Sequence, residues 1–405
     1  MFLQKFPTDL TFQATERTAV HSFKPSPPLL PTMAILLVGM ALAAPADAAD
    51  VGPPLKTLLA AGPQGAGHRE AAEAWQQVAH ADAAQLPVVL AALDNAGPLA
   101  ANWIRAAVET IAERHLQRGG RLPAAELEQF LRDTRHAPRA RRLAYEWLAQ
   151  VDPTVPGRLL PGMLNDPSLE LRRDAVARVI GEAVALATSG KSTEAAVRYD
   201  EAFAAARDTD QVNLLADRLR KLGRPVDLAR HFGFLVAWKI IGPFDNKGQK
   251  GFDVAYPPEQ RVDFQASCPG KHGEVRWIEH TTKDNFGHVD FNRVLGEEKG
   301  VIAYAAAEFL ADKPQPVEFR MASFNALKLW LNGKLIDQHH VYHGGSQMDQ
   351  YVSPATLQPG RNLILLKACQ NEQTQEWARH WGFQLRVCDA LGTAVLSADR
   401  KEAAR

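Results

Sequence analysis

The 405-residue sequence has only three cysteines and no excess of charge of either sign. Its 46 basic and 46 acidic residues cancel, so the positive footprint of most nucleic-acid-binding proteins is missing and no nucleic-acid partner is expected. Three cysteines are too few for a disulfide framework, and no CxxC or Cys/His spacing indicates zinc. Cys369 and Cys388 fall in two predicted strands, so they form either one disulfide bond or two buried free thiols.

Signatures of catalysis are also missing. The sequence contains no His-Glu-x-x-His pattern and no Gly-x-Ser-x-Gly nucleophile elbow. Gly190-Lys191-Ser192 is not a phosphate-binding loop, because Ala185 stands where that loop has its first glycine. A glycosidase needs two carboxylates about 5–10 Å apart. The nearest candidates are scattered over predicted loops and strands: Glu259, Asp263, Glu274 and Glu279. We therefore expect a protein that is not an enzyme.

Long apolar runs are absent except for a short one near the N-terminus. Residues 33–44 are fewer than the ~20 that a membrane span requires. Ala46-Asp47-Ala48 follows them and has the small-x-small pattern of a cleavage site. We interpret residues 1–48 as a signal peptide cleaved near Ala48, which predicts a periplasmic or extracellular chain with no stable membrane span. A non-cleaved anchor is the alternative.

Residues 51–231 are rich in Ala, Leu and Arg, with apolar residues at helical spacing. Pro98, Pro138 and Pro167 each open a similar segment, and their spacings of 40 and 29 residues bracket the period of paired-helix repeats. The segment 166–176 resembles part of a HEAT repeat, and 192–222 resembles a tetratricopeptide-type helix pair. The resemblance implies an α-solenoid with a protein-binding surface, and a non-repetitive helical bundle is the alternative.

From residue 232 onward, short apolar runs alternate with turn-rich loops, which favours an antiparallel β-sandwich. Residues 251–259 are expected to be an extended loop. The run 234–245 is aromatic and β-branched and ends in a Gly-Pro breaker. The predicted strands are 275–279, 301–309, 316–323, 328–331, 334–339, 362–369 and 382–388.

The clearest local signal is Asn332-Gly333, which predicts a β-hairpin with a type I′ turn because both residues tolerate positive φ. With this pair as the loop, we expect Trp330 opposite Leu335 and Lys328 opposite Asp337. Strand alternation then defines the face that points to the core. That face carries Leu327, Leu329 and Ile336.

Several motifs occur in one order in this half. They are Trp330-Leu-Asn-Gly-Lys334, His343-Gly-Gly345, Leu357-x-x-Gly360-x-Asn362-Leu363 and Lys367. This order resembles the galactose-binding-like jelly roll, including the non-catalytic sugar-binding domain of family 2 glycoside hydrolases. The resemblance covers residues 326–389 closely and 237–325 loosely, and it implies a sandwich over 232–395 followed by a tail at 396–405. Gly360 and Asn362, like Asn332 and Gly333, are interpreted as turn residues.

Loops at one end of a β-sandwich are where ligand contacts tend to lie. The loop between the last two predicted strands contains Trp377, Arg379, His380 and Trp381, which combine two aromatic faces with cationic donors. These are the main ligand-binding candidates. Trp330 is a further candidate for stacking on a sugar ring. The alternative is that Trp330 and Trp381 belong to the core.

Histidines are concentrated at His339, His340 and His343, which together with Asp349 are candidates for a metal site. Alternatively, Gln347 and Asp349 help to coordinate a structural calcium ion. No other cofactor is expected.

Together these patterns predict a multidomain chain with α-solenoid-like helical repeats followed by a β-sandwich. The predicted function is that of an exported binding protein: the helices bind protein, and the jelly roll binds carbohydrate or protein. An accessory component or unrecognised enzyme of polysaccharide hydrolysis is one alternative. A structural protein of the cell envelope is another.

Overall fold

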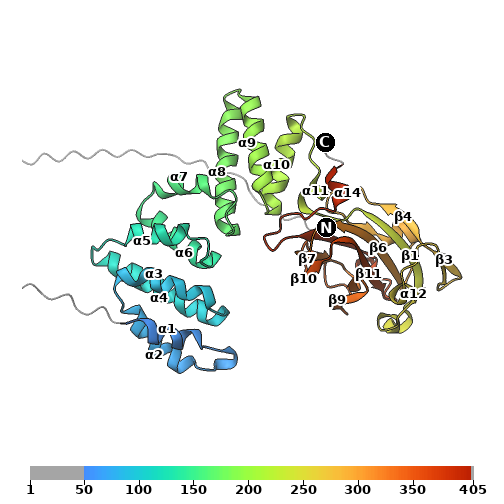
Figure 1. Cartoon of the computed structure of the whole chain (residues 1–405), viewed down its shortest axis with the longest axis horizontal. Coiled ribbons are helices and arrows are strands. Elements are labelled where there is room, and N and C mark those ends of the chain that lie inside the picture. The colour runs from blue at the N-terminus through green and yellow to red at the C-terminus, as the bar shows by residue number, and fades with distance from the viewer. Residues whose placement is uncertain (1–49, 403–405) are drawn as a thin grey trace, which may run out of the picture. The chain divides into compact units, whose positions relative to one another are not determined.

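The computed structural model describes residues 50–402, which comprise a helical half followed by antiparallel sheets (Figure 1). This confirms the predicted order of an α half and then a β half. The predicted signal peptide and its cleavage point near Ala48 lie outside the described residues. Within residues 50–402, none of the helices has the length and apolar character that crossing a membrane requires.

The helical half extends to residue 232. Its helices are α1 (Gly52–Leu59), α2 (His68–Ala79), α3 (Leu86–Ala91), α4 (Pro98–Gln117), α5 (Ala124–Arg132), α6 (Pro138–Val151), α7 (Val155–Leu159), α8 (Leu169–Thr188), α9 (Ser192–Ala205), α10 (Thr209–Lys221) and α11 (Leu228–Phe232). Pro98 and Pro138 occupy the first position of their helices, where a missing backbone N–H costs nothing. Ser168 caps α8, one residue after Pro167.

Arginines from one helix bind the carbonyl groups left unpaired at the end of another. Arg139, at the start of α6, donates to the Leu93 carbonyl at 2.6 Å. The buried Arg141 donates to the Leu131 carbonyl at the end of α5 and makes two 2.7 Å bonds to Asp166. Helix ends leave such carbonyl groups without intrahelical partners, so these contacts both satisfy them and join neighbouring helices.

Two apolar clusters fill the helical half, and both include residues of α8. The first extends from α1 to the beginning of α8, where Leu171 and Ala175 belong to it. The second begins at Val176 in the same helix and includes α9, α10 and α11. Phe234, just beyond α11, also belongs to the second cluster, so this core reaches the start of the β half.

The β half contains three antiparallel sheets. Its strands are β1 (Ala237–Asp245), β2 (Ser267–Pro269), β3 (Glu274–Arg276), β4 (Ile278–Thr281), β5 (Val289–Asp290), β6 (Val301–Ala311), β7 (Gln315–Ala322), β8 (Ala326–Leu331), β9 (Lys334–His339), β10 (Tyr351–Leu357), β11 (Gly360–Gln370) and β12 (Gly382–Cys388). The six-stranded sheet has the order β4-β1-β6-β11-β8-β9, the four-stranded sheet β10-β7-β12-β5, and β2 pairs with β3. Short helices α12 (Pro257–Gln260), α13 (Phe291–Leu295) and α14 (Ala398–Glu402) complete this half.

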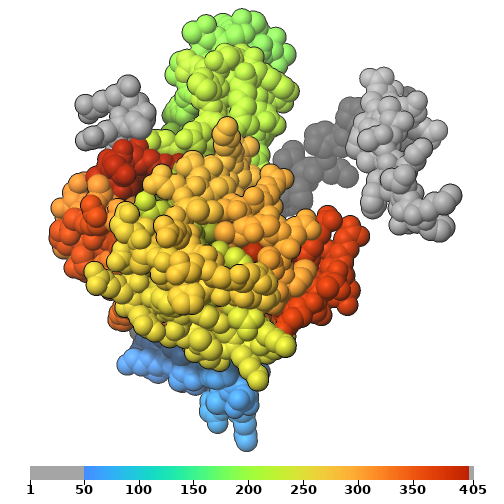
Figure 2. All heavy atoms as spheres, turned by 90° about the vertical axis from the view of Figure 1, so that its right-hand side faces the viewer, coloured from blue at the N-terminus to red at the C-terminus, as the bar shows by residue number. Residues whose placement is uncertain are grey.

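The two larger sheets pack against each other. Leu329 and Leu366 of the six-stranded sheet share one buried cluster with Phe319 and Leu385 of the four-stranded sheet. The opposite, outer face of the six-stranded sheet carries a second apolar layer, which includes Trp330. Residues 247–277 provide the cover of this layer, and yellow spheres of this part of the chain dominate the face turned to the viewer in Figure 2. We refer to residues 247–277 as the cover segment.

The hairpin turn agrees with its prediction. Asn332 and Gly333 have φ values of 51° and 79°, both in the left-handed region that a type I′ turn requires. Trp330 pairs with Leu335, as expected from a two-residue loop. Leu329 points into the core between the sheets and Trp330 into the outer layer, so the predicted core face is confirmed.

One predicted pairing in the hairpin is wrong. Lys328 lies opposite Gln338, while Asp337 lies opposite Leu329. The register shifts between Leu329 and Trp330, which is the signature of a β-bulge. The extra residue moves every pair beyond it by one position, so a register counted from the turn fails there.

Two other local predictions need correction. The Gly242-Pro243 pair does not end the first strand: β1 continues to Asp245, with a register shift between Ile241 and Phe244. The expected extended loop at 251–259 contains a helical turn, since α12 begins at Pro257. Proline at a first helical position favours such a turn.

Cys369 and Cys388 are free, buried thiols, which excludes the disulfide alternative between them. Cys369 lies in β11 of the six-stranded sheet and Cys388 in β12 of the four-stranded sheet. Burial raises the pKa of Cys369 to about 12, so this thiol is un-ionised at neutral pH. Both side chains therefore act as small apolar residues.

Candidate functional site

Trp377 is the most exposed tryptophan of the chain. It lies in a one-turn helix, Glu376–Ala378, between β11 and β12, and 57% of it is accessible. The other seven tryptophans are buried or half-buried. A large aromatic surface left in water is more informative than an exposed aliphatic side chain, because tryptophan burial is strongly favourable. Trp377 is therefore the clearest ligand-contact candidate among the predicted residues.

The ring of Trp377 is held by His343. The two rings are perpendicular, with centroids 5.0 Å apart. His343 Nε2 lies 3.1 Å from Asn371 Oδ1, so Nε2 carries the proton and donates. The backbone of His343 has a φ of 58°, unusual for a residue other than glycine. These contacts hold the indole in position, while more than half of the Trp377 side chain stays accessible.

A buried amide pair supports the loop from below. Asn325 Nδ2 donates to Gln370 Oε1 and to the His380 carbonyl, both at 3.1 Å, and Asn325 Oδ1 accepts from Gly382 N at 3.0 Å. Gln370 Nε2 donates to the carbonyl groups of Ala378 and His380. Asn325 and Gln370 are 1% and 0% exposed, so the loop rests on a satisfied and rigid polar network.

The remaining predicted ligand contacts divide into surface and core residues. Arg379 and His380 are exposed; Arg379 lies 3.7 Å from Glu376, and the His380 ring stacks on Phe324. Trp381 is only 1% exposed, and its Nε1 donates to a backbone carbonyl in β11. Trp330 lies in the outer layer. The two buried tryptophans belong to the core, as the alternative prediction stated, because each fills an apolar layer of the sandwich.

The predicted metal-site residues are not brought together. His339 and His340 stack on different aromatic rings, and His343 supports Trp377. Asp349, the calcium candidate, directs both carboxylate oxygens to arginines, while the Gln347 carbonyl accepts from a nearby backbone N–H. Within residues 50–402 there is no group of three or more His, Cys, Asp or Glu side chains that could hold a metal ion.

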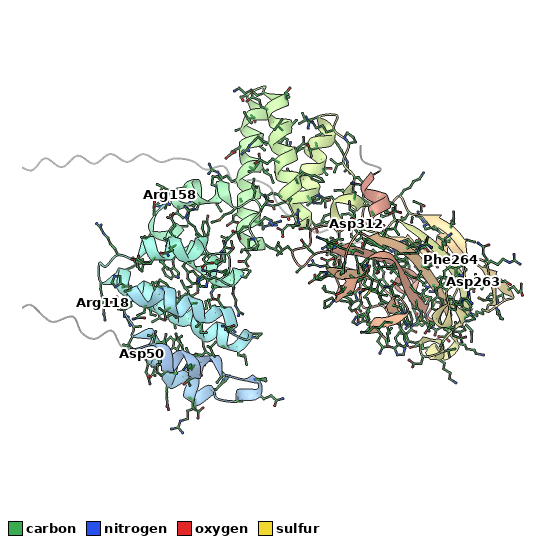
Figure 3. The ribbon with its side chains drawn as sticks, in the orientation of Figure 1. Asp50, Arg118, Arg158, Asp263, Phe264 and Asp312 are labelled. Carbon is green, nitrogen blue, oxygen red and sulfur yellow. The ribbon has the colours of Figure 1, made fainter. Side chains whose placement is uncertain are left out.

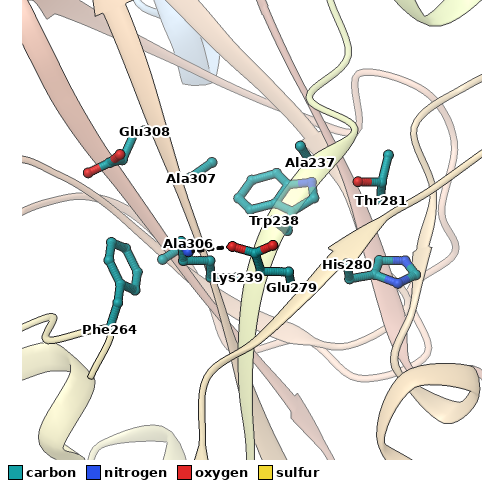
Figure 4. A pocket seen from close by; sticks show the side chains of 10 residues that line it. All are labelled: Ala237, Trp238, Lys239, Phe264, Glu279, His280, Thr281, Ala306, Ala307 and Glu308. Carbon is teal, nitrogen blue, oxygen red and sulfur yellow. Dashed lines mark hydrogen bonds and ion pairs between the residues drawn. The ribbon is translucent and has the colours of Figure 1, made fainter. Parts of the chain in front are cut away.

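A hollow of about 260 Å³ lies beside β4, where the cover segment ends (Figure 4). Its floor consists of small side chains from β1 and β6: Ala237, Ala306 and Ala307. Phe264 forms one wall at the border of the β half (Figure 3), and it is braced edge-on against Trp277 at 5.3 Å. Lys239 Nζ lies 5.1 Å from the centre of the Phe264 ring and 2.8 Å from Glu279 Oε1.

A second hollow of about 470 Å³ lies at the end of β4. It shares His280 and Thr281 with the first. Its other lining residues are polar and come from the stretch between β4 and α13 and from α13 itself: Thr282, Lys283, Asp284, His288, Asp290 and Arg293. Burial lowers the pKa of His288, against the opposing influence of the nearby carboxylates, so its imidazole is neutral at pH 7.

The sequence did not indicate either hollow. Their residues come from β1, β4, β6 and two loops, and no local motif joins them. Of the carboxylates considered for glycoside hydrolysis, Glu279 lines the first hollow, but the hydrogen bond from Lys239 lowers its pKa. Glu259 is held 2.7 Å from Lys367. A general acid requires the opposite change, a raised pKa.

No protein-family model matches the sequence, and no curated protein matches it. Solved structures give partial similarities. A β-glucosidase from Kluyveromyces marxianus in complex with glucose is 16% identical, with a TM-score of 0.22, over 27% of this chain and 14% of that one. A β-glucuronidase from an uncultured Clostridium sp. is 14% identical, with a TM-score of 0.25, over 39% and 29%. A Faecalibacterium prausnitzii β-glucuronidase is 17% identical, with a TM-score of 0.21, over 39% and 31%. This chain thus spans less than a third of each.

Proposed function

We propose that this chain is an exported, non-catalytic binding protein whose β-sandwich binds carbohydrate at the Trp377 surface. That surface consists of Trp377, His343, Arg379 and His380. In this proposal the β half is a galactose-binding-like jelly roll, and the helical half is a solenoid of repeats that presents a protein-binding surface.

The observation that supports sugar binding is an exposed indole on a rigid loop. Indole faces pack on the C–H faces of sugar rings, and a ring already held in place loses little side-chain entropy on binding. The ring of Trp377 packs against His343, and its loop is held by Asn325 and Gln370. Arg379 and His380 lie in the same loop and are exposed, so hydrogen-bond donors are available within three residues of Trp377.

Affinity gel electrophoresis of the purified chain tests this proposal directly. The probes are neutral glycans cast in the gel: laminarin, xylan, galactomannan and hydroxyethyl cellulose. We expect at least one glycan to retard the wild-type protein, and Trp377→Ala to weaken binding by about 10-fold or more, as for a tryptophan at the centre of an interface. Trp377→Phe, which keeps an aromatic face, should retain part of the retardation.

The matched control is Val352→Ala, which removes an apolar side chain 47% exposed on the edge strand β10 and should leave binding unchanged. Circular dichroism of each variant verifies the fold. Equal retardation of wild type and Trp377→Ala, or no retardation by any glycan, would contradict the proposal. Release of reducing sugars from a retained glycan would contradict its non-catalytic part.

A further inference from the structure

The two hollows beside β4 are neighbours that share two lining residues, and we name them together the β4 groove. It is lined by Phe264, Glu279, His280, Thr281 and Arg293, among others, and its two hollows meet at His280 and Thr281, which line both. β4 is an edge strand of the six-stranded sheet, so the groove runs along an open side of the sandwich.

The charges of this groove balance: Lys283 and Asp284 contribute one charge of each sign, and the other charged side chains are in ion pairs. Glu279 pairs with Lys239 at 2.8 Å, Glu308 pairs with Arg361 at 2.9 Å, and Asp290 Oδ2 lies 3.4 Å from Arg293 Nε. A site built for an anion or a cation would carry an excess of the opposite charge. The groove therefore fits an uncharged ligand that can accept and donate hydrogen bonds.

The rest of the lining is suited to such a ligand. The alanine floor and the Phe264 ring provide apolar contact area. The side chains of His280 and Thr281 make no hydrogen bond within residues 50–402, so their donors and acceptors are free for a ligand. Alternating apolar faces and hydroxyl groups are the chemical character of a neutral sugar chain.

The groove adjoins the Trp377 surface. Asn292 Nδ2 donates to the Arg379 carbonyl at 3.0 Å, and Arg293, the next residue, lines the second hollow. The loop that carries Trp377 is thus joined to the wall of the groove.

From this arrangement we infer that the β4 groove continues the Trp377 surface and binds further residues of the same neutral polysaccharide chain. The inference rests on the proposed function and deepens it: the ligand is a polymer bound along the side of the sandwich, with Trp377 contacting one part of the chain and Phe264 another.

Isothermal titration calorimetry with laminari-, cello-, xylo- and manno-oligosaccharides of one to six residues tests this inference. For the series that binds, we expect wild-type affinity to rise about 10-fold or more between the disaccharide and the hexasaccharide. Phe264→Ala should remove most of that rise and leave disaccharide binding unchanged. Trp377→Ala should weaken binding at every length.

Because Phe264 also packs on Trp277, a second variant with little structural role is needed. The double substitution His280→Ala and Thr281→Val changes two groove side chains that make no hydrogen bond in the described part of the chain, and it should weaken hexasaccharide binding alone. Two outcomes would overturn the proposed role of the groove and leave the proposed function intact. One is an affinity that does not depend on oligosaccharide length. The other is an affinity that Trp377→Ala weakens and neither groove variant changes. Absence of binding to all oligosaccharides and their parent polymers overturns both.

Discussion

Arg386 and Asp349 form a bidentate ion pair, with Nε 2.7 Å from Oδ1 and Nη2 2.5 Å from Oδ2. The remaining nitrogen, Nη1, donates to the carbonyl groups of Phe232 at 3.1 Å and Gly392 at 3.2 Å. One guanidinium, 4% exposed, thus joins β12 to the loop before β10 and to the end of α11. Burial acts to raise the pKa of Asp349, but the hydrogen bonds from Arg386 and Arg320 outweigh it and the net pKa is lowered.

Replacing Asp349 should therefore destabilise the whole chain. Asp349→Asn leaves the buried guanidinium of Arg386 without its counter-ion, and we expect the free energy of unfolding to fall by about 3 kcal/mol. Urea denaturation at pH 7 measures this. Glu73→Gln is the control, because its partner Arg69 is exposed and such pairs contribute little. Equal stability of wild type and Asp349→Asn would show that the pair has no net role.

A substitution at Gly233, which follows α11, provides a second test of the junction between α11 and β12. Its φ is 82°, and a Cβ atom placed on it would lie 2.4 Å from the Val387 carbonyl oxygen. Gly223 has a similar φ of 76° but no heavy atom within 4 Å of that position. Gly223→Ala should cost about 1–2 kcal/mol for the left-handed backbone alone.

Gly233→Ala should cost about 1–3 kcal/mol more, since β12 must also move away from the new methyl group. Thermal and urea unfolding of the two variants separate the backbone contribution from the steric one. The steric contribution would be disproved by two variants of equal stability.

How far the sequence predicted this structure depends on the range of the interactions involved. Local chemistry predicted the proline-initiated helices and the Asn332-Gly333 turn, because each is determined by a few neighbouring residues. The strand β10 was not predicted because Pro354 interrupts its strand-like sequence pattern. Proline is tolerated there because β10 is an edge strand, where one N–H needs no partner.

The same distinction applies to the site. The position of the loop that carries Trp377 followed from the order of the strands, but which of its tryptophans is exposed depends on packing. Trp381 lies in the core because Phe291, distant in sequence, packs beside it. The β4 groove depends on alanines and a phenylalanine that are unremarkable until β1, β4 and β6 are placed side by side.

Lys367 fastens the cover segment to the sheet. The side chain is 0% exposed, and its Nζ donates to the Phe252 carbonyl at 3.0 Å, to the Val254 carbonyl at 2.9 Å and to Glu259 Oε1 at 2.7 Å. Glu259→Ala leaves this ammonium group buried without a counter-ion. We expect a loss of about 3–5 kcal/mol in the free energy of unfolding, together with faster tryptic cleavage at Lys247 and Lys250.

Replacing both charges should reverse much of this effect. The double variant Lys367→Met and Glu259→Leu removes the buried ammonium group and its partner together, and apolar replacements of a buried pair are often neutral. Its stability should therefore exceed that of Glu259→Ala. If the double variant is no more stable than Glu259→Ala, the stability lost in Glu259→Ala results from lost packing and not from the unpaired charge.

His231 should make the junction between the halves sensitive to acid. Burial and the neighbouring Arg207 lower the pKa of His231 to about 4, against the opposing hydrogen bond with the Ala206 carbonyl. Since the folded pKa lies below the unfolded value of about 6.5, folding favours the neutral ring. The contribution of the neutral His231 ring to the free energy of unfolding is therefore fully present above pH 6.5 and is lost as the pH falls toward 4. The loss amounts to about 2.5 kcal/mol at pH 4.5.

The difference between wild type and His231→Phe in the free energy of unfolding, measured in urea at pH 7.5 and pH 4.5, isolates this contribution. Phenylalanine keeps the ring packed on Phe203 but cannot be protonated, so the variant should lose less stability on acidification by about 2.5 kcal/mol. His272→Phe, at an exposed position, should lose as much free energy of unfolding between pH 7.5 and pH 4.5 as the wild-type protein does. Identical losses in wild type and His231→Phe, or an NMR titration of His231 near pH 6.5, would mean that this imidazole is solvated in the folded chain.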